Sequence, residues 1–317
     1  MLSPGEYKSL GRLVAASAGF VSNFILWRQS GYFDSAADTK PLLHLWSLAI
    51  EEQFYIFWPL IIAFFHRYYK EFLLYVIFTL CVMSLIYSIY LVNINVVADF
   101  YSPLTRFWEL AIGSLIALRS DLIKNKFLKS LLSCLAFILI ISATLFLNQN
   151  KLFPGYLALI PTIGASILIL SGASNTGWIN KNILSTKIFV WIGLISYPLY
   201  LWHWPLLSFA RIAESATPSY ELRLAILTAS FLLAWLTYRF FELPIRSNSA
   251  LFPKKTTQYL VITMIIICFI GLGIKHFKGF RSRVFSNYNG DPSSIVVGED
   301  RKLLKDDCSI KSELQNS

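Results

Sequence analysis

Long apolar segments alternate with short polar ones along the whole chain, and this pattern predicts its architecture. Nine segments are apolar over most of their length and approach or reach the length of a membrane span. They lie at about residues 9–27, 45–65, 72–92, 104–118, 128–147, 155–170, 188–209, 222–241 and 257–274. Because lipid offers no hydrogen-bonding partner to an open backbone, each segment is expected to be a helix.

The composition supports the same class of protein. Hydrophobic residues make up 56% of the 317 residues and charged residues 15%, and the mean hydropathy is +0.56. Soluble domains are only about 45–50% apolar and about 25% charged. The sequence therefore predicts an all-α, polytopic integral membrane protein with about nine transmembrane helices.

The net charge of +10 bears on topology rather than on nucleic acid, because most Lys and Arg residues lie between the apolar segments. Thirteen of them flank the segments on the N-terminal side, against five in the short loops on the other side. The thirteen are Lys8, Arg12, Arg67, Lys70, Arg119, Lys124, Lys126, Lys129, Lys181, Lys187, Arg246, Lys254 and Lys255, and the five are Arg28, Lys40, Lys151, Arg211 and Arg223. The bias predicts a cytoplasmic N-terminus and, with nine spans, an extracytoplasmic C-terminal tail. Lys275 and Lys278 run against this bias.

Two regions follow from the same pattern. Residues 1–274 form the membrane domain, and residues 275–317 form a polar tail that is too short for a domain of ordinary size. The tail is expected to be either a flexible end or the first piece of a further domain. Four scattered cysteines predict neither a disulfide framework nor a metal site.

The segment 45–65 carries two adjacent acids, Glu51 and Glu52, within an otherwise apolar run. An ionised side chain at membrane depth costs roughly 2.5–3.5 kcal/mol even on lenient scales, so such residues usually face the protein interior and serve function. At 100° per residue, His44, Ser47 and Glu51 fall on one stripe that continues to an aromatic face. We expect this face to contact protein or water.

Other ionisable residues fall at the same outer depth. Arg106 and Glu109 are three residues apart near the start of the segment 104–118, and His203 with Trp204 lies in the outer part of the segment 188–209. Depth alone suggests that Arg106 pairs with Glu51 or Glu52. A second pair, Arg239 and Glu242, stands at the inner end of the segment 222–241.

Each group also has a structural interpretation. The pairs Arg106–Glu109 and Arg239–Glu242 can simply lock helix packing, and His203 between two tryptophans can belong to an interfacial aromatic belt. No GxSxG, P-loop or HExxH motif is present. His and Glu side chains can act as general bases on a hydroxyl, which suits an acyltransferase, and they equally suit a proton-coupled transporter.

Several strings carry a family resemblance. In chain order they are "SNFILWRQSGYFD", "PLLHLWSLAIEEQFYIFWPL", "SPLTRFWELAIGSLIAL", "ISYPLYLWHWPLL" and "YRFFELPIR". Over roughly residues 5–280 the chain resembles the acyltransferase 3 family of integral membrane O-acyltransferases. It resembles most closely the bacterial branch that acetylates lipopolysaccharide O-antigen and related surface sugars.

The resemblance implies acyl-CoA, expected to be acetyl-CoA, as the cytoplasmic donor substrate, with no bound cofactor. The acceptor is a hydroxyl of a cell-surface glycan or lipid-linked saccharide, and the location is the bacterial inner membrane. Glu51, Glu52 and His203 match strings that imply supporting catalytic roles. Residues that match binding strings are His44, Arg106, Glu109, Trp204, Arg239 and Glu242.

The resemblance also implies two further spans before residue 1. In the family these spans carry a basic residue and a His thought to be catalytic. In this branch the membrane part is also followed by an SGNH-type domain. The chain is therefore expected to be a fragment of the family pattern. A transporter of a lipid-linked or small substrate and an inactive membrane scaffold remain the competing hypotheses.

Overall fold

The computed structural model describes residues 2–30, 37–118, 123, 125–147, 152–172, 177–214, 217–247 and 254–280. The described part is helical and contains no strand. The α-helices are α1 (Pro4–Ala18), α2 (Ser22–Gln29), α3 (Leu45–Tyr68), α4 (Leu73–Ile94), α5 (Val96–Tyr101), α6 (Pro103–Leu118), α7 (Lys126–Phe146), α8 (Leu159–Gly172), α9 (Lys187–Glu214), α10 (Tyr220–Thr237), α11 (Leu243–Ser247) and α12 (Lys254–His276). Shorter helical turns are η1 (Ala37–Thr39), η2 (Lys70–Phe72), η3 (Gly155–Ala158), η4 (Asn180–Leu184) and η5 (Tyr238–Glu242).

Six helical segments of the described part are long and apolar enough to cross a membrane. They are Leu45–Tyr68, Lys70–Ile94, Lys126–Phe146, Gly155–Gly172, Tyr220–Arg246 and Thr257–His276, and each matches one of the nine predicted spans. Large apolar side chains such as Phe57 and Leu60 are more than 60% exposed on them. This is the surface expected of helices that face lipid, so the chain is an all-α, multi-pass membrane protein.

The other three predicted spans behave differently. The segment 9–27 is not one helix, because α1 ends at Ala18 and Phe20 adopts a left-handed φ of 55° before α2 begins. Helix α6 has 16 residues, about 24 Å at the helical rise, which is short of the roughly 30 Å hydrocarbon core. Helix α9 has 28 residues and the length to span, but its Trp, Tyr, Pro and His residues make it less apolar than the six.

Local sequence signals explain several helix starts. Ser3 and Glu6 form a capping box at the start of α1, with Glu6 Oε2 accepting from the Ser3 N–H at 2.8 Å and Ser3 Oγ accepting from the Glu6 N–H at 3.2 Å. Asn95 and Asn125 cap α5 and α7 with their side-chain oxygens. These caps satisfy backbone donors that would otherwise lack a partner.

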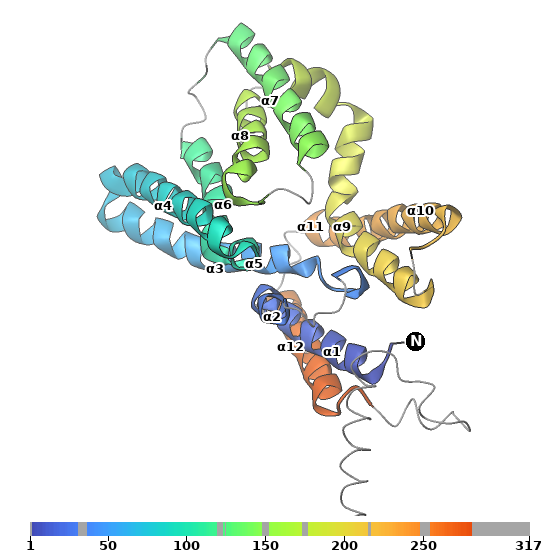
Figure 1. The fold of residues 1–317 in the computed structure, drawn as a ribbon. Helices are drawn as coiled ribbons and strands as arrows, with labels where there is room; N and C mark the ends of the chain where they lie inside the picture. The colour runs from blue at the N-terminus through green and yellow to red at the C-terminus, as the bar shows by residue number, and fades with distance from the viewer. Residues whose placement is uncertain are drawn as a thin grey trace, which may run out of the picture.

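The helices pack in sequence-adjacent and sequence-distant pairs: α4 with α6, α7 with α8, α9 with α10, and α1 with α12 (Figure 1). A buried core joins α3, α4, α6 and η3 around Trp58, Ile77 and Trp108. The Trp58 indole N–H donates to Ser114 Oγ at 2.7 Å, which satisfies its polar atom inside this core.

The pairing of α1 with α12 brings the two described ends of the chain together. An ideal Cβ at Gly279, just after α12, would overlap the carbonyl oxygen of Pro4, at the start of α1, so these two ends are in contact. The cytoplasmic N-terminus and the extracytoplasmic tail stay predictions, because this contact does not say on which side of a membrane either end lies. The tail from residue 281 to 317 lies outside the described residues.

Candidate functional site

The beginning of α3 and the middle of α9 form an aromatic cluster of His44, Tyr200 and His203. The His44 ring centroid lies 5.0 Å from that of Tyr200 and 6.1 Å from that of His203. The Tyr200 hydroxyl donates to the carbonyl oxygen of His44 and shares a 2.8 Å hydrogen bond with the Ser47 hydroxyl. The two histidines predicted at one depth are therefore neighbours.

His44 is held in an unusual electrostatic state. It is the N-cap residue of α3, its side chain is buried, and neither ring nitrogen has a hydrogen-bond partner among the described residues. Burial, together with the neighbouring His203, lowers the pKa of His44 to about 4. The imidazole is consequently neutral at pH 7, with one nitrogen free to accept a hydrogen bond and the other able to donate one.

Trp204 ties α9 to the segment before α3, whereas His203 forms its hydrogen bond within α9. His203 Nδ1 lies 3.0 Å from the carbonyl oxygen of Leu199, one turn earlier on the same helix. The Trp204 indole N–H donates to the carbonyl oxygen of Lys40 at 2.9 Å. Trp204 thus fixes the backbone four residues before His44, so its role in the described structure is to position the cluster.

The two acids both lie about two turns after His44 along α3. Glu51 and Glu52 are half-buried, and both lie within electrostatic range of Tyr197 on α9. Glu242, in η5, also interacts electrostatically with Tyr197. Acids that were predicted at two levels therefore converge on one side of α9, below the His44 cluster.

Arg106 does not hold either acid of the pair. Its guanidinium donates to Glu109 Oε1 at 2.7 Å, and it lies over the rings of Trp46, Phe100 and Phe153 at 5.3–5.6 Å. The prediction of an Arg106–Glu51 or Arg106–Glu52 pair is wrong, because Glu109 lies one turn away on the same face of α6 and already occupies the guanidinium. The Arg106–Glu109 pair itself is confirmed.

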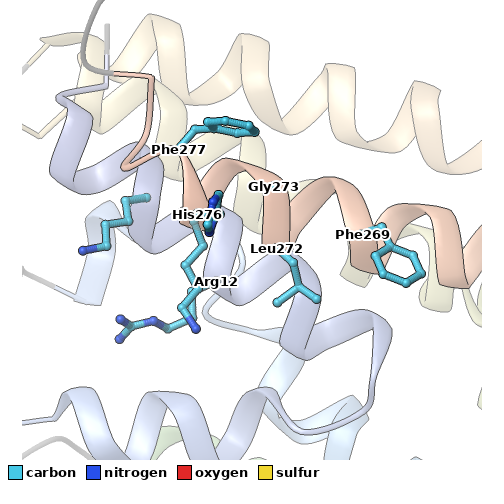
Figure 2. Close-up of a pocket in the computed structure, with 8 residues that line it drawn as sticks. Arg12, Phe269, Leu272, Gly273, His276 and Phe277 are labelled. Carbon is cyan, nitrogen blue, oxygen red and sulfur yellow. The ribbon is translucent and has the colours of Figure 1, made fainter.

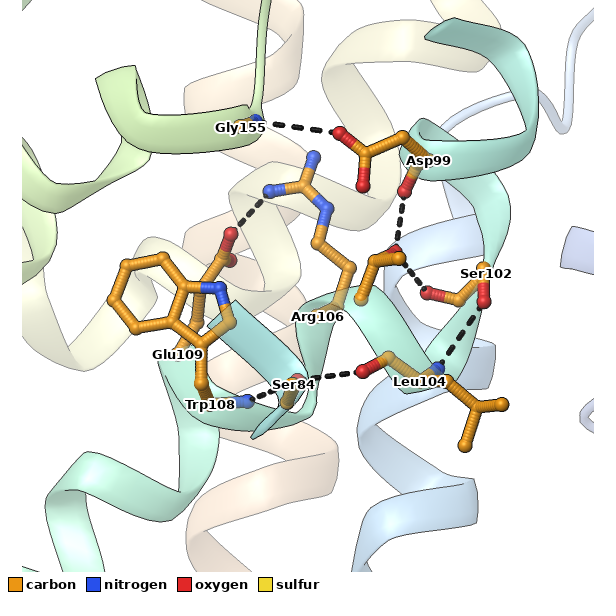
Figure 3. A network of polar contacts seen from close by, with 9 residues as sticks. Ser84, Asp99, Ser102, Leu104, Arg106, Trp108, Glu109 and Gly155 are labelled. Carbon is orange, nitrogen blue, oxygen red and sulfur yellow. Dashed lines mark hydrogen bonds and ion pairs between the residues drawn. The ribbon is translucent and has the colours of Figure 1, made fainter. Parts of the chain in front are cut away.

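Around Arg106 a buried polar network fixes the junction of α5 and α6 (Figure 3). Asp99 Oδ2 accepts from the Gly155 N–H at 3.3 Å, and Thr105 Oγ1 donates to the Asp99 carbonyl at 2.6 Å. Ser84 Oγ of α4 donates to the Leu104 carbonyl at 2.5 Å and accepts from the Trp108 N–H at 3.1 Å. These bonds join α4, α5, α6 and η3, so the network holds the packing of these elements.

The predicted inner pair is also different. Glu242 Oε1 accepts from Arg246 at 3.0 Å, and Arg239 is exposed. Residues 238–242 form a π-helical turn, which has more residues per turn than an α-helix. Residues three apart there no longer share a face, so the prediction of an Arg239–Glu242 pair is wrong. Glu242 Oε2 is buried and has no partner among the described residues.

Some residues of this arrangement escaped the sequence reasoning. Asp99 is completely buried, but a lone acid between two apolar segments is typical of a loop. The contact of Trp46 and Phe100 with Arg106 could not be predicted either, because aromatic residues are frequent along the apolar segments of this chain. Only the Asn95 cap, three residues before Ala98, signals that a short helix holds Asp99.

The described residues contain no group of three or more His, Cys, Asp or Glu side chains that could bind a metal ion. The His44 cluster and the neighbouring acids present imidazole, phenol and carboxyl groups. Neutral imidazole and carboxylate groups can accept a hydrogen bond or a proton from a hydroxyl.

Comparisons with known proteins agree with the family resemblance. A family model described as an acyltransferase domain matches residues 12–239. Peptidoglycan O-acetyltransferase OatA of Listeria monocytogenes is 30% identical over 261 residues, covering 77% of this chain and 42% of the relative. O-acetyltransferase OatA of Staphylococcus aureus is 30% identical over 276 residues, covering 80% of this chain and 45% of the relative.

An uncharacterised protein of Haemophilus influenzae is 30% identical over 182 residues, covering 54% of this chain and 74% of that protein. No solved structure matches the chain significantly. The chain spans less than half the length of the two OatA relatives. With the family model covering most of its length, the chain belongs to the acyltransferase 3 family.

Proposed function

We propose that this chain is the membrane part of a bacterial O-acyltransferase. It moves an acyl group, acetyl in the simplest case, from acyl-CoA on the cytoplasmic side to a hydroxyl of a cell-envelope glycan. In the transfer the acceptor oxygen forms an ester bond to the acyl carbon, the C–S bond of the thioester breaks, and the hydroxyl proton ends on the CoA thiol. The membrane is the bacterial plasma membrane.

One observation carries this proposal: His44 is a buried, neutral imidazole without a partner among the described residues, beside His203 and Tyr200. Leaving a buried polar group unsatisfied costs about 1–3 kcal/mol, so a bound hydroxyl at this position would recover part of that free energy. We assign His44 and His203 to binding the acceptor hydroxyl. Membership of an acyltransferase family supplies the reaction class.

Glu51 and Glu52 have a supporting role in this scheme. They lie on the helix that His44 caps, both interact electrostatically with Tyr197, and Glu51 also interacts with Tyr200, so we assign them to setting the field along the path of the hydroxyl proton. Trp204 positions the cluster through Lys40, and the Arg106–Glu109 pair holds α6. Glu242 and Arg239 lie nearer the opposite end of this path, where we place the approach of the donor.

The acceptor class has two candidates. The sequence strings resemble the O-antigen branch, whereas the Listeria relative is named a peptidoglycan O-acetyltransferase. Both acceptors are polysaccharides with free hydroxyls outside the plasma membrane. We place peptidoglycan saccharides first, because that printed name belongs to a relative that covers 77% of this chain.

The test is transfer of radiolabelled acetyl from acetyl-CoA in membranes that contain the chain, with peptidoglycan fragments or lipopolysaccharide as acceptor. We expect alkali-labile label on one acceptor class, and a higher acceptor KM for His44→Gln. His66→Gln is the matched control, because His66 is an exposed histidine on the same helix. Label no higher than in membranes without the chain, with both acceptors, would overturn the proposal. Uptake of a saccharide without acyl-CoA would favour a transporter instead.

A further inference from the structure

The pairing of α1 with α12 creates an open, basic pocket of about 620 Å³ that the acyl-transfer scheme does not use. Its cationic residues are Lys8 and Arg12 of α1 and Lys275 and His276 at the end of α12. Figure 2 shows Arg12 and His276 beside each other, with Leu272 and Phe269 following along α12. The pocket thus combines residues from the two ends of the described chain.

Close helix packing builds this pocket. A Cβ at Gly11 would lie 2.6 Å from Ile274 Cγ2, and a Cβ at Gly271 would lie 2.6 Å from the backbone nitrogen of Ala15. The two glycines therefore let the helix backbones approach closely, as small residues do in membrane helix pairs. The long basic side chains on either side of this seam are brought to one place as a result.

The charges of the pocket are not neutralised within the part of the chain that the structure describes. No ion pair joins Lys8, Arg12, Lys275 or His276 to an acid among the residues that the structure describes. The nearest acid along α1, Glu6, is bonded to the backbone of Ser3. Three permanent positive charges within one open pocket attract a multiply charged anion such as a phosphate group.

The remaining lining is apolar and exposed. Phe269 is 68%, Leu272 43% and Phe277 61% exposed. These side chains lie on and just after the segment Thr257–His276, which is long and apolar enough to cross a membrane, so the cations stand at its end. A phosphate beside an apolar surface at the end of a span is the chemistry of an anionic phospholipid.

We propose that the pocket between α1 and α12 binds the phosphate headgroup of an anionic phospholipid, with the acyl chains along Phe269 and Leu272. The same phosphate chemistry could come from a water-soluble phosphate compound. The apolar lining favours the lipid, and the experiment separates the two sources. Such a site would also place Lys275 with Lys8 and Arg12 on the anionic, cytoplasmic leaflet.

The experiment is a lipid-binding titration of the full chain in neutral detergent, read by native mass spectrometry. The probes are phosphatidylglycerol, phosphatidylcholine and inorganic phosphate. The test variant is Arg12→Gln/Lys275→Gln. The matched control is Lys181→Gln/Lys187→Gln, which removes the same charge from exposed positions outside the pocket. A further variant, Arg12→Lys, keeps the charge.

We expect phosphatidylglycerol to bind more tightly than phosphatidylcholine. The double variant should weaken its binding about 10- to 30-fold, while the control and Arg12→Lys change it less than about threefold. Higher salt should weaken binding to the unaltered protein more than to the variant.

Two results would overturn the lipid assignment. Equal phosphatidylglycerol binding by the unaltered protein and the double variant would show that this pocket is not a lipid-binding site. Inorganic phosphate binding that is lost in the variant, with lipid binding unchanged, would assign the pocket to a soluble phosphate compound. Unchanged helix content by circular dichroism guards against a folding artefact. The experiment measures lipid binding, so its result does not depend on whether the protein transfers acyl groups.

Discussion

The hydroxyl of Tyr200 is the contact that joins α9 to the beginning of α3, and its removal tests how the site is built. Tyr200→Phe deletes the donor to the His44 carbonyl and the 2.8 Å hydrogen bond with Ser47 without changing the packing of the ring. Hydrogen bonds in membrane proteins contribute about 0.6 kcal/mol on average and about 1.7 kcal/mol at most. Two such bonds amount to about 1–3 kcal/mol.

If that free energy holds His44 in place, its loss lowers kcat/KM for acyl transfer by about 5- to 140-fold, since 1.4 kcal/mol is a factor of ten. The assay is acetyl transfer by purified protein in detergent, beside thermal unfolding followed by size-exclusion chromatography. Tyr75→Phe is the control, because it makes the same chemical change away from the site, at a tyrosine of α4 that is 69% exposed. Equal activity of Tyr200→Phe and the unaltered protein would refute the reasoning.

Three further predictions follow from other contacts. Glu109→Gln removes the ion-pair partner of Arg106, whose side chain is only 10% exposed, and should destabilise the protein by about 3–5 kcal/mol. Arg246→Gln breaks a pair whose Arg side chain is 67% exposed and should cost less than about 1 kcal/mol. Similar denaturation midpoints for the two variants would contradict this. Gly271→Ala should lower the melting temperature, because the added Cβ pushes α12 away from Ala15. Gly193→Ala is the control: an added Cβ there meets nothing within 4 Å, so the melting temperature should stay unchanged or rise. An unchanged melting temperature for Gly271→Ala would show that the two helices are not in close contact. The folded-state pKa of His44 is about 4, so acceptor binding through its neutral ring should persist as pH falls from 7 to 5 and be lost near pH 4. Loss of binding centred on pH 6.5, the ordinary pKa of a histidine, would exclude His44 as the binding group.

The hydrophobic pattern predicted most of the helices because lipid leaves the backbone one solution. Six predicted spans match helices of sufficient length and hydropathy, but the break at Phe20 could not be predicted. The Phe20 carbonyl accepts a hydrogen bond from the Gln53 side chain of α3 at 2.7 Å, and no local pattern reports such a tertiary contact.

Depth along a span predicted which residues share a level, but not which of them pair. His44 and His203 meet because the beginning of α3 lies beside the middle of α9. Arg106 was predicted at the depth of Glu51, but its guanidinium lies over the ring of Trp46, near the beginning of α3. Which face a helix turns toward which neighbour is decided by tertiary packing. For the same reason the π-helical turn that pairs Glu242 with Arg246 was not visible in the spacing.

The central claim is that the residues between α3 and α9 serve acyl transfer, and Glu51 and Glu52 test it because two adjacent acids inside a span are expensive unless they have a function. The most direct measurement is acetyl transfer by Glu51→Gln and Glu52→Gln, normalised to the amount of each protein in the membrane. We expect each variant to reach nearly the unaltered membrane level and to transfer at least tenfold more slowly. If membrane level and transfer fall together, or if transfer per molecule is unchanged, the two acids are structural and the proposed site is wrong.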